Sequence, residues 1–225
     1  MNRSAINRSI AEATEFFARH CFALPPFASW EPQEWQRRGR EADEVRFLRL
    51  GWDVTDYNSG CFETLGTTLF TLRNGSRAGG KVYAEKIMLL RAGQATPFLY
   101  HIHKTEDIIN RGGSGTGRVA VQLYNSSPQG GLEESPVLVV CDGIRRKLPA
   151  GGAVVLEPGE SITLTPYLYH ALRAVDRHAL IGEIATVNDD ATDNIFLDRL
   201  QRFPGIVEDE PPLRLLCHEY PDAPQ

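Results

Sequence analysis

The sequence predicts an all-β fold, an antiparallel sandwich or barrel, from three observations. From Thr67 onward, short runs rich in β-branched and aromatic residues alternate with turn signals at roughly regular intervals. Asp142-Gly143 lies between two alternating segments, a strong short-range signal for a β-hairpin. No helical pattern of crossover length separates the runs, so antiparallel pairing is favoured over a parallel α/β sheet.

The N-terminal part, residues 1–66, is expected to be a helical and irregular arm. An amphipathic helix is predicted at its start, because apolar residues recur at spacings of three and four. A second short helix is predicted after "LPPFASW", with Pro32 in its first turn. The apolar face of the first helix is Ile6, Ile10, Ala13, Phe16 and Phe17.

Residues 67–187 are expected to form the barrel, and residues 188–225 a polar, irregular tail packed over it. Together they make one domain spanning 1–225, which suits a chain of 225 residues. The predicted strands are "TLFTL", "KVYAEKIMLL", "PFLYHIH", "RVAVQLY", "VLVVC", "AVVLEP", "ESITLTP", "YHALRAV" and "LIGEIATV".

The composition argues against several classes of partner. A net charge of -5 removes the long-range attraction to phosphate backbones on which most nucleic-acid binders depend. No apolar run approaches the ~20 residues that a membrane-spanning helix needs. The first twenty residues carry acids and a helical pattern where a signal peptide would be apolar, so we expect a cytoplasmic protein. Four dispersed cysteines without a CxxC pair predict reduced thiols.

The glycine-rich stretch "GGSGTG", residues 112–117, has two interpretations. A phosphate-binding loop would place backbone amides of a helix N-terminus against the anion. The residues that follow, "RVAVQLY", alternate like a strand instead. A plain turn is therefore the prediction.

His101 and His103 form a candidate metal site, because residues i and i+2 of a strand project to the same face. Glu106 adds a carboxylate, and His170 lies on another predicted strand. Three imidazoles and one carboxylate, with positions left open for substrate oxygens, suit Mn²⁺, Fe²⁺ or Zn²⁺. The alternative is that these are ordinary surface or core histidines.

The residues of this candidate site resemble those of a known family. An HxH motif, a following glutamate and a single histidine about sixty residues later resemble the cupin barrel. More narrowly, the sequence is similar to the cupin-type D-lyxose isomerases over most of its length. The segments that carry the resemblance are "LPPFASW", "LGWDVTDY", "TLFTLRNGS", "YAEKIM", "EDIINRGG", "SITLTPYLYH" and "VNDD".

The resemblance implies that His101, His103, Glu106 and His170 are the metal ligands, with one departure. Four residues separate the second histidine from the glutamate in the family pattern, whereas only Lys104 and Thr105 do so here. An ungapped alignment places Leu99 where the first family histidine stands. Because a two-residue shift keeps strand parity, His103 is expected to replace Leu99 as a ligand, and Lys104 is expected to face away.

The resemblance also implies a reaction, the interconversion of a free aldose and its 2-ketose. The expected pairs are D-lyxose and D-xylulose, or D-mannose and D-fructose. A divalent metal, Mn²⁺ first, with Fe²⁺, Co²⁺ and Zn²⁺ as alternatives, would polarise the carbonyl, and the expected assembly is a homodimer. Two alternatives stay open, a non-catalytic sugar-binding cupin and a metal-dependent dioxygenase.

Proton transfer requires further residues, and several are candidates. Glu183 shares strand character with the barrel interior, and Glu208 or Glu210 could close over its mouth. Lys86 sits in an otherwise apolar strand, where a buried cation needs a reason, and it could stabilise an oxyanion. A surface or salt-bridged charge is the alternative for each of them.

Overall fold

A computed structural model of the chain describes residues 1–223. The helices lie in the N-terminal part and the strands follow. The helices are α1 (Arg3–Arg19), α2 (Pro32–Arg37) and α3 (Asp43–Phe47), with 3₁₀ turns at Pro26–Ser29 and Arg40–Ala42. The strands are β1 (Gly51–Thr55), β2 (Thr67–Arg73), β3 (Tyr83–Leu90), β4 (Leu99–His101), β5 (Glu106–Asn110), β6 (Val119–Ser126), β7 (Leu132–Glu133), β8 (Val137–Cys141), β9 (Ile144–Leu148), β10 (Ala153–Leu156), β11 (Ser161–Leu164), β12 (Leu168–Ala174), β13 (Ala179–Thr186) and β14 (Asn194–Phe196).

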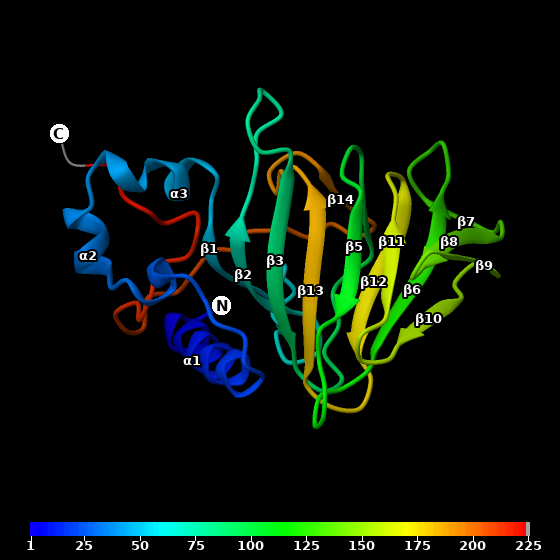
Figure 1. Cartoon of the computed structure of the whole chain (residues 1–225), viewed down its shortest axis with the longest axis horizontal. Coiled ribbons are helices and arrows are strands. Elements are labelled where there is room, and N and C mark those ends of the chain that lie inside the picture. Colours follow the sequence, from blue (N-terminus) through cyan, green and yellow to red (C-terminus); the bar gives the residue numbers. More distant parts are fainter. Residues whose placement is uncertain (224–225) are drawn as a thin grey trace.

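The strands form two sheets, and neighbouring strands in both are antiparallel. The larger sheet has eight strands in the order β1-β2-β3-β13-β5-β11-β8-β9. The smaller follows the order β10-β6-β12-β4-β14, with β7 beside β6. The helices gather at the β1 end of the larger sheet (Figure 1). The predicted all-β antiparallel fold is therefore confirmed.

The core between the sheets follows from the alternation of side chains along each strand. In β6, for example, Val119, Val121 and Leu123 are fully buried while Gln122 is exposed. Residues from both sheets meet in one apolar cluster, which includes Leu69, Met88 and Leu172. Some of the residues at its border line the cavity described below.

Helix α1 covers the opposite face of the larger sheet, where it contacts β1, β2 and β3. All five residues of its predicted apolar face are buried, as the spacing predicted. The Phe17 ring stacks on Trp52 with centroids 6.2 Å apart. Strand β1, which contains Trp52, was not predicted. Since all five of its residues are buried, it lacks the alternating pattern that reveals a strand.

The strands extend beyond the expected barrel limits of 67–187 at both ends. β1 lies in the expected arm, and β14 lies in the expected tail, where it pairs with β4. Arm and tail are also joined directly, because the guanidinium of buried Arg3 binds the carboxylates of Glu208 and Glu219. Both segments are therefore integral parts of the fold.

Three smaller predictions are confirmed, and they concern the hairpin turn, the glycine-rich stretch and the cysteines. Asp142 and Gly143 both have positive φ, 50° and 80°, as a type I′ hairpin turn requires. The glycine-rich stretch is a loop between β5 and β6 that leads into a strand. The cysteines are free. Within residues 1–223, no helix is both long and apolar enough to cross a bilayer.

We expect Leu123→Ala to destabilise the fold by about 2–5 kcal/mol, because it removes a fully buried side chain from the core between the sheets. Urea unfolding followed by circular dichroism measures the loss. Leu138→Ala is the control, since Leu138 is 73% exposed and its truncation should change stability by no more than about 0.5 kcal/mol. Equal losses in both variants would contradict this description of the core.

Candidate functional site

A cavity of about 60 Å³ lies between the two sheets. Strands β2, β3, β5 and β13 of the larger sheet line one side, and β4, β12 and β14 of the smaller sheet line the other. The tail adds Asp190 and Arg202 to its wall.

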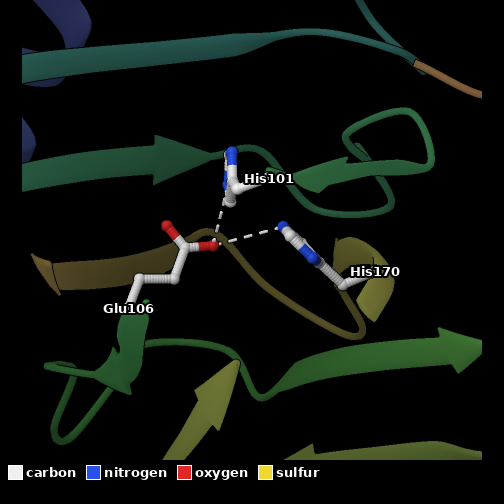
Figure 2. Close-up of side chains that lie close together, drawn as sticks. All are labelled: His101, Glu106 and His170. Carbon is white, nitrogen blue, oxygen red and sulfur yellow. Dashed lines mark ion pairs between the residues drawn. The ribbon is translucent and has the colours of Figure 1, made fainter. Parts of the chain in front are cut away.

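His101, Glu106 and His170 converge in this cavity (Figure 2). The Nε2 atom of His101 lies 3.3 Å from Glu106 Oε1, and the Nε2 atom of His170 lies 3.2 Å from the same oxygen. One potential ligand atom from each residue lies within 4.8 Å of the others. All three side chains are buried, so they form a compact internal donor set.

Strand geometry explains how three distant residues meet. Glu106 begins β5, whose alternating burial turns Glu106 and Ile108 toward the interior. His101 ends β4, and His170 lies in β12, which pairs with β4 so that His170 is opposite Leu99. The carboxylate therefore comes from one sheet and the two imidazoles come from the other.

The hydrogen bonds of the two imidazoles favour a cation between them. His170 Nδ1 lies 3.0 Å from the Leu168 carbonyl, and His101 Nδ1 lies 3.3 Å from the Asp193 carbonyl. A carbonyl can only accept, so both Nδ1 atoms carry the proton, and in a neutral ring Nε2 presents its lone pair. Both lone pairs then face a carboxylate oxygen. A divalent metal ion would satisfy all three groups, so the residues fit such an ion.

Burial and Lys104 control the charge states at this point. Burial lowers the pKa of His101, and the nearby Lys104 ammonium lowers it further, which favours the neutral imidazole. Burial alone would raise the pKa of Glu106, but the nearby Lys104 ammonium opposes this effect, and that pKa lies well below its ordinary value. The site thus contains a carboxylate and at least one neutral imidazole, the states that bind a metal.

Charged side chains of alternating sign continue from Glu106 along the cavity. Lys104 Nζ lies 2.6 Å from Glu106 Oε2 and 2.8 Å from Glu183 Oε1. Lys86 Nζ lies 3.4 Å from Glu183 Oε1 and 3.6 Å from Asp190 Oδ1. Arg202 then pairs with Asp190 and Asp53. We call this set the charge row: Glu106, Lys104, Glu183, Lys86, Asp190, Arg202 and Asp53.

The two acids at the far end of the charge row are affected differently. Burial would raise the pKa of Asp190, but Lys86 and Arg202 outweigh it and lower that pKa. For Asp53 burial is the largest effect, and it raises the pKa in spite of Arg202. The row contains four carboxylates and three cations, so a bound cation would reduce the excess of negative groups.

Comparison with known proteins identifies the family. Residues 1–220 match the family model described as D-lyxose isomerase. The chain is 49% identical over 226 residues to a D-lyxose/D-mannose isomerase of Serratia proteamaculans, with 98% of each chain covered. The chain belongs to the D-lyxose isomerase family. It is therefore an aldose–ketose isomerase. A D-lyxose/D-mannose isomerase of Escherichia coli O157:H7 is 48% identical over the same length and coverage.

Solved structures support the fold of this isomerase. L-ribose isomerase of Acinetobacter sp. DL28, in complex with L-ribose, superposes with a TM-score of 0.56 at 14% identity, covering 92% of this chain and 98% of that one. L-ribose isomerase of Cellulomonas parahominis, with L-psicose, gives a TM-score of 0.54 at 14% identity, covering 89% and 94%. At this identity the likeness concerns the cupin-like β fold alone.

The four residues suggested for proton transfer can now be placed in the isomerase. Lys86 and Glu183 line the cavity, where they face each other across β3 and β13. Glu210 does not reach it, because its Oε1 accepts a hydrogen bond from Asn7 of α1. Glu208 is likewise held by Arg3. Glu208 and Glu210 thus hold the tail against α1, and neither lines the cavity.

His103 does not join the other predicted ligands. Strand β4 ends at His101, and residues 102–105 turn, so the alternation that would have aligned His103 with His101 stops. His103 is exposed, and Lys104, which was expected to face away, is buried in the cavity. Leu99 borders the cavity without offering a donor atom. The structure therefore brings together three of the four expected ligands.

Asp193, in the tail, holds the turn after His101, and sequence reasoning missed it. Its buried carboxylate accepts hydrogen bonds from the backbone N–H groups of Ile102, His103 and Lys104, at 3.1, 2.8 and 3.0 Å. Its own carbonyl accepts from His101 Nδ1. One tail residue thus orients an imidazole and turns Lys104 inward. The sequence contains no local signal for this long-range contact.

We expect Asp193→Asn to destabilise the isomerase by about 1–3 kcal/mol, because an amide cannot accept all three backbone N–H groups and leaves at least one unsatisfied. Thermal unfolding measures the loss, and hydrogen exchange should show faster exchange at residues 102–104. Asp198→Asn, an exposed change in the same tail, is the matched control and should have no effect. Unchanged exchange in Asp193→Asn would contradict the role assigned to this carboxylate.

Proposed function

We propose that the isomerase interconverts D-lyxose with D-xylulose and D-mannose with D-fructose, using a divalent metal ion. The names of the two relatives, 49% and 48% identical over nearly the whole chain, support the substrates. The observation that carries the proposal is the convergence of two imidazole Nε2 atoms on one carboxylate oxygen in the cavity between the sheets.

We assign the metal to His101, Glu106 and His170. When bound there, a divalent ion would polarise the carbonyl of the sugar and stabilise the negative charge that develops on its oxygens. Two imidazoles and one carboxylate leave coordination positions open and suit Fe²⁺ as well as Mn²⁺. Mn²⁺ remains the first expectation, and metal analysis of the purified protein distinguishes the two.

Glu183 is the proposed proton carrier. The reaction moves one hydrogen from C2 to C1 while the carbonyl shifts from C1 to C2. Glu183 lies between two ammonium groups, 2.8 Å from Lys104 Nζ and 3.4 Å from Lys86 Nζ, and a carboxylate in this place can accept a proton from the sugar. The two lysines also supply positive charge beside the oxygens on which charge develops.

The pairing in the cavity favours a free sugar over a sugar phosphate. Each cation of the charge row already faces a carboxylate: Lys104 faces Glu106, Lys86 faces Glu183, and Arg202 faces Asp53. A phosphate group would need cations that are not already neutralised. Neutral hydroxyl groups do not carry this requirement.

Incubation of the Mn²⁺-loaded protein with each aldose tests the proposal. D-xylulose from D-lyxose, and D-fructose from D-mannose, are the expected products. D-mannose 6-phosphate serves as a parallel substrate and should not be converted. Conversion of the phosphate alone would refute the substrate class, and failure with every aldose would refute the reaction.

We expect His101→Ala and His170→Ala each to weaken metal binding by about a hundredfold or more, with loss of isomerase activity. Removing even an indirect partner of a ligand costs 10–100-fold, and these changes remove the ligand itself. Metal content per chain is measured beside the isomerase rate. His103→Ala is the matched control and should keep both, since His103 is exposed. Loss of metal in His103→Ala would show that His103 is a ligand after all.

We expect Glu183→Gln to lower kcat by about 10²–10⁴-fold while metal content is kept, because the amide cannot accept the proton. Lys104 retains Glu106 as its partner, and Lys86 retains Asp190 and Asn188, so the fold should persist. Glu85→Gln, on the neighbouring strand and away from the cavity, is the control. An unchanged kcat in Glu183→Gln would assign the proton transfer to another group.

Two expectations stay predictions. We propose that the isomerase works in the cytoplasm, which its free cysteines suit. We also propose that it assembles as a homodimer.

A further inference from the structure

The outer face of the smaller sheet lacks the polar residues expected of a sheet that borders water. Such a sheet alternates apolar residues inward with polar residues outward. In β6, Val121 and Leu123 lie in the core, so Ala120 and Tyr124 point outward. The registers of β10, β12, β4 and β14 bring their outward residues onto the same face. We call six of these residues the outer patch: Ala120, Tyr124, Val155, Ala171, Tyr100 and Ile195.

The outer patch is open to solvent in the single chain. Its six members are half-buried or exposed, and Arg173 is the one charged residue at the outward positions of these five strands. Tyr167, just before β12, is 53% exposed and extends the patch, with its ring centroid 5.6 Å from that of Tyr100. The helices of the described chain gather at the β1 end of the larger sheet and leave this face uncovered (Figure 1). A contiguous apolar face of this kind marks an interaction surface.

The size of the outer patch suits a dimer that dissociates measurably. Strands β6 and β12 are eight and seven residues long, and three shorter strands flank them. At about 3.4 Å per residue and about 4.8 Å between strands, the face covers roughly 400 Å². That is the size of the apolar patches that mark functional surfaces on single chains, and it lies below the roughly 800 Å² per partner of a tight complex. Two such faces therefore form a contact whose dissociation constant can be measured.

Opposite charges border the outer patch at its two ends. Arg173 lies opposite Ala120 near the start of β6. Glu134 follows β7, which pairs with the last residues of β6. These two levels lie roughly 15 Å apart along the strand direction. Both charged residues are exposed, and neither forms an ion pair within residues 1–223. The patch is thus positive at one end and negative at the other.

We propose that two copies of this chain pair through the outer patch, related by a two-fold axis that crosses the strands near Gln122. The same patch then serves both copies, as a two-fold dimer requires. Strands of the two copies run in opposite directions across the contact, so Arg173 of each copy approaches Glu134 of the partner subunit. An apolar centre with one unpaired charge at each end fits a second copy better than a nucleic acid or a strongly charged protein. The inference rests on the homodimer of the proposed function and gives it a surface.

The strands that carry the outer patch also carry the imidazoles of the candidate metal site. Tyr100 precedes His101 in β4, and Ala171 follows His170 in β12. Strand β4 has only three residues and lies between β12 and β14. A second copy packed on the outer patch would therefore support both imidazole-bearing strands from their solvent side.

Gln122→Glu tests the outer patch because it adds a charge near the axis and keeps the size and shape of the side chain. Gln122 is exposed in the single chain, so the fold should persist. Two like charges then face each other across the contact, and the dissociation constant of the dimer should rise about 10- to 100-fold. Sedimentation velocity over a dilution series measures this constant. Gln36→Glu, the same change at an exposed position of α2, is the matched control and should leave the constant unchanged.

Charge reversal tests the orientation of the two copies. Arg173→Glu and Glu134→Arg should each raise the dissociation constant about tenfold, because each replaces two attractive pairs by two repulsive ones. The double variant restores opposite charges and should return the constant to within about threefold of the wild-type value. Arg145→Glu, at an exposed position of β9, is the control and should have no effect. A double variant that pairs more weakly than both single variants would overturn the two-fold arrangement.

The outcomes separate the dimer surface from the reaction. A chain that stays monomeric at every concentration overturns the proposal, and so does a dimer whose dissociation constant is unchanged in Gln122→Glu. In the second case the homodimer persists through another surface. The isomerase rate is measured on the same samples. A dimer that responds as expected but converts no sugar refutes the reaction and supports the surface, whereas sugar conversion by an unresponsive dimer refutes the surface and leaves the reaction standing.

Discussion

The need to balance buried charge governs the centre of this protein. A carboxylate or ammonium taken out of water costs several kcal/mol unless an opposite charge and hydrogen bonds compensate it. The charge row meets this need by alternation, with neighbouring partners 2.6–3.6 Å apart from Glu106 through Lys104, Glu183 and Lys86 to Asp190. Each inner member balances two neighbours, so removal of one leaves two others uncompensated. The arrangement therefore fixes the shape of the cavity as well as its charge.

This constraint explains why the tail belongs to the site although it contains little regular structure. Asp190 and Arg202 come from the tail and complete the charge row, and Asp193 of the same segment holds the turn that follows β4. The tail is fixed in turn by β14, which pairs with β4, and by Arg3 of α1. The helical arm thus supports the cavity indirectly, by anchoring the segment that completes it.

The sequence was informative wherever side-chain orientation followed a regular period. Alternation predicted the strands, and helical spacing predicted the buried face of α1. It failed at the end of β4, because a turn held by a residue ninety positions away replaces the alternation there. His103 was consequently expected inside and Lys104 outside, the reverse of what the structure contains. Contacts of this length leave no periodic trace in a single sequence.

The charge row also has a bearing on catalysis in the mechanism proposed for this isomerase. Before the reaction the negative charge resides on Glu183, between Lys104 and Lys86. When Glu183 accepts the proton from C2, an equal negative charge appears on the sugar oxygens, so the total charge of the cavity is unchanged. The two ammonium groups, which their other carboxylate partners hold in place, then lie beside the newly charged oxygens without rearranging. Charges fixed in advance by the fold stabilise such a transition state more effectively than groups that must reorient, because little reorganisation accompanies the proton transfer.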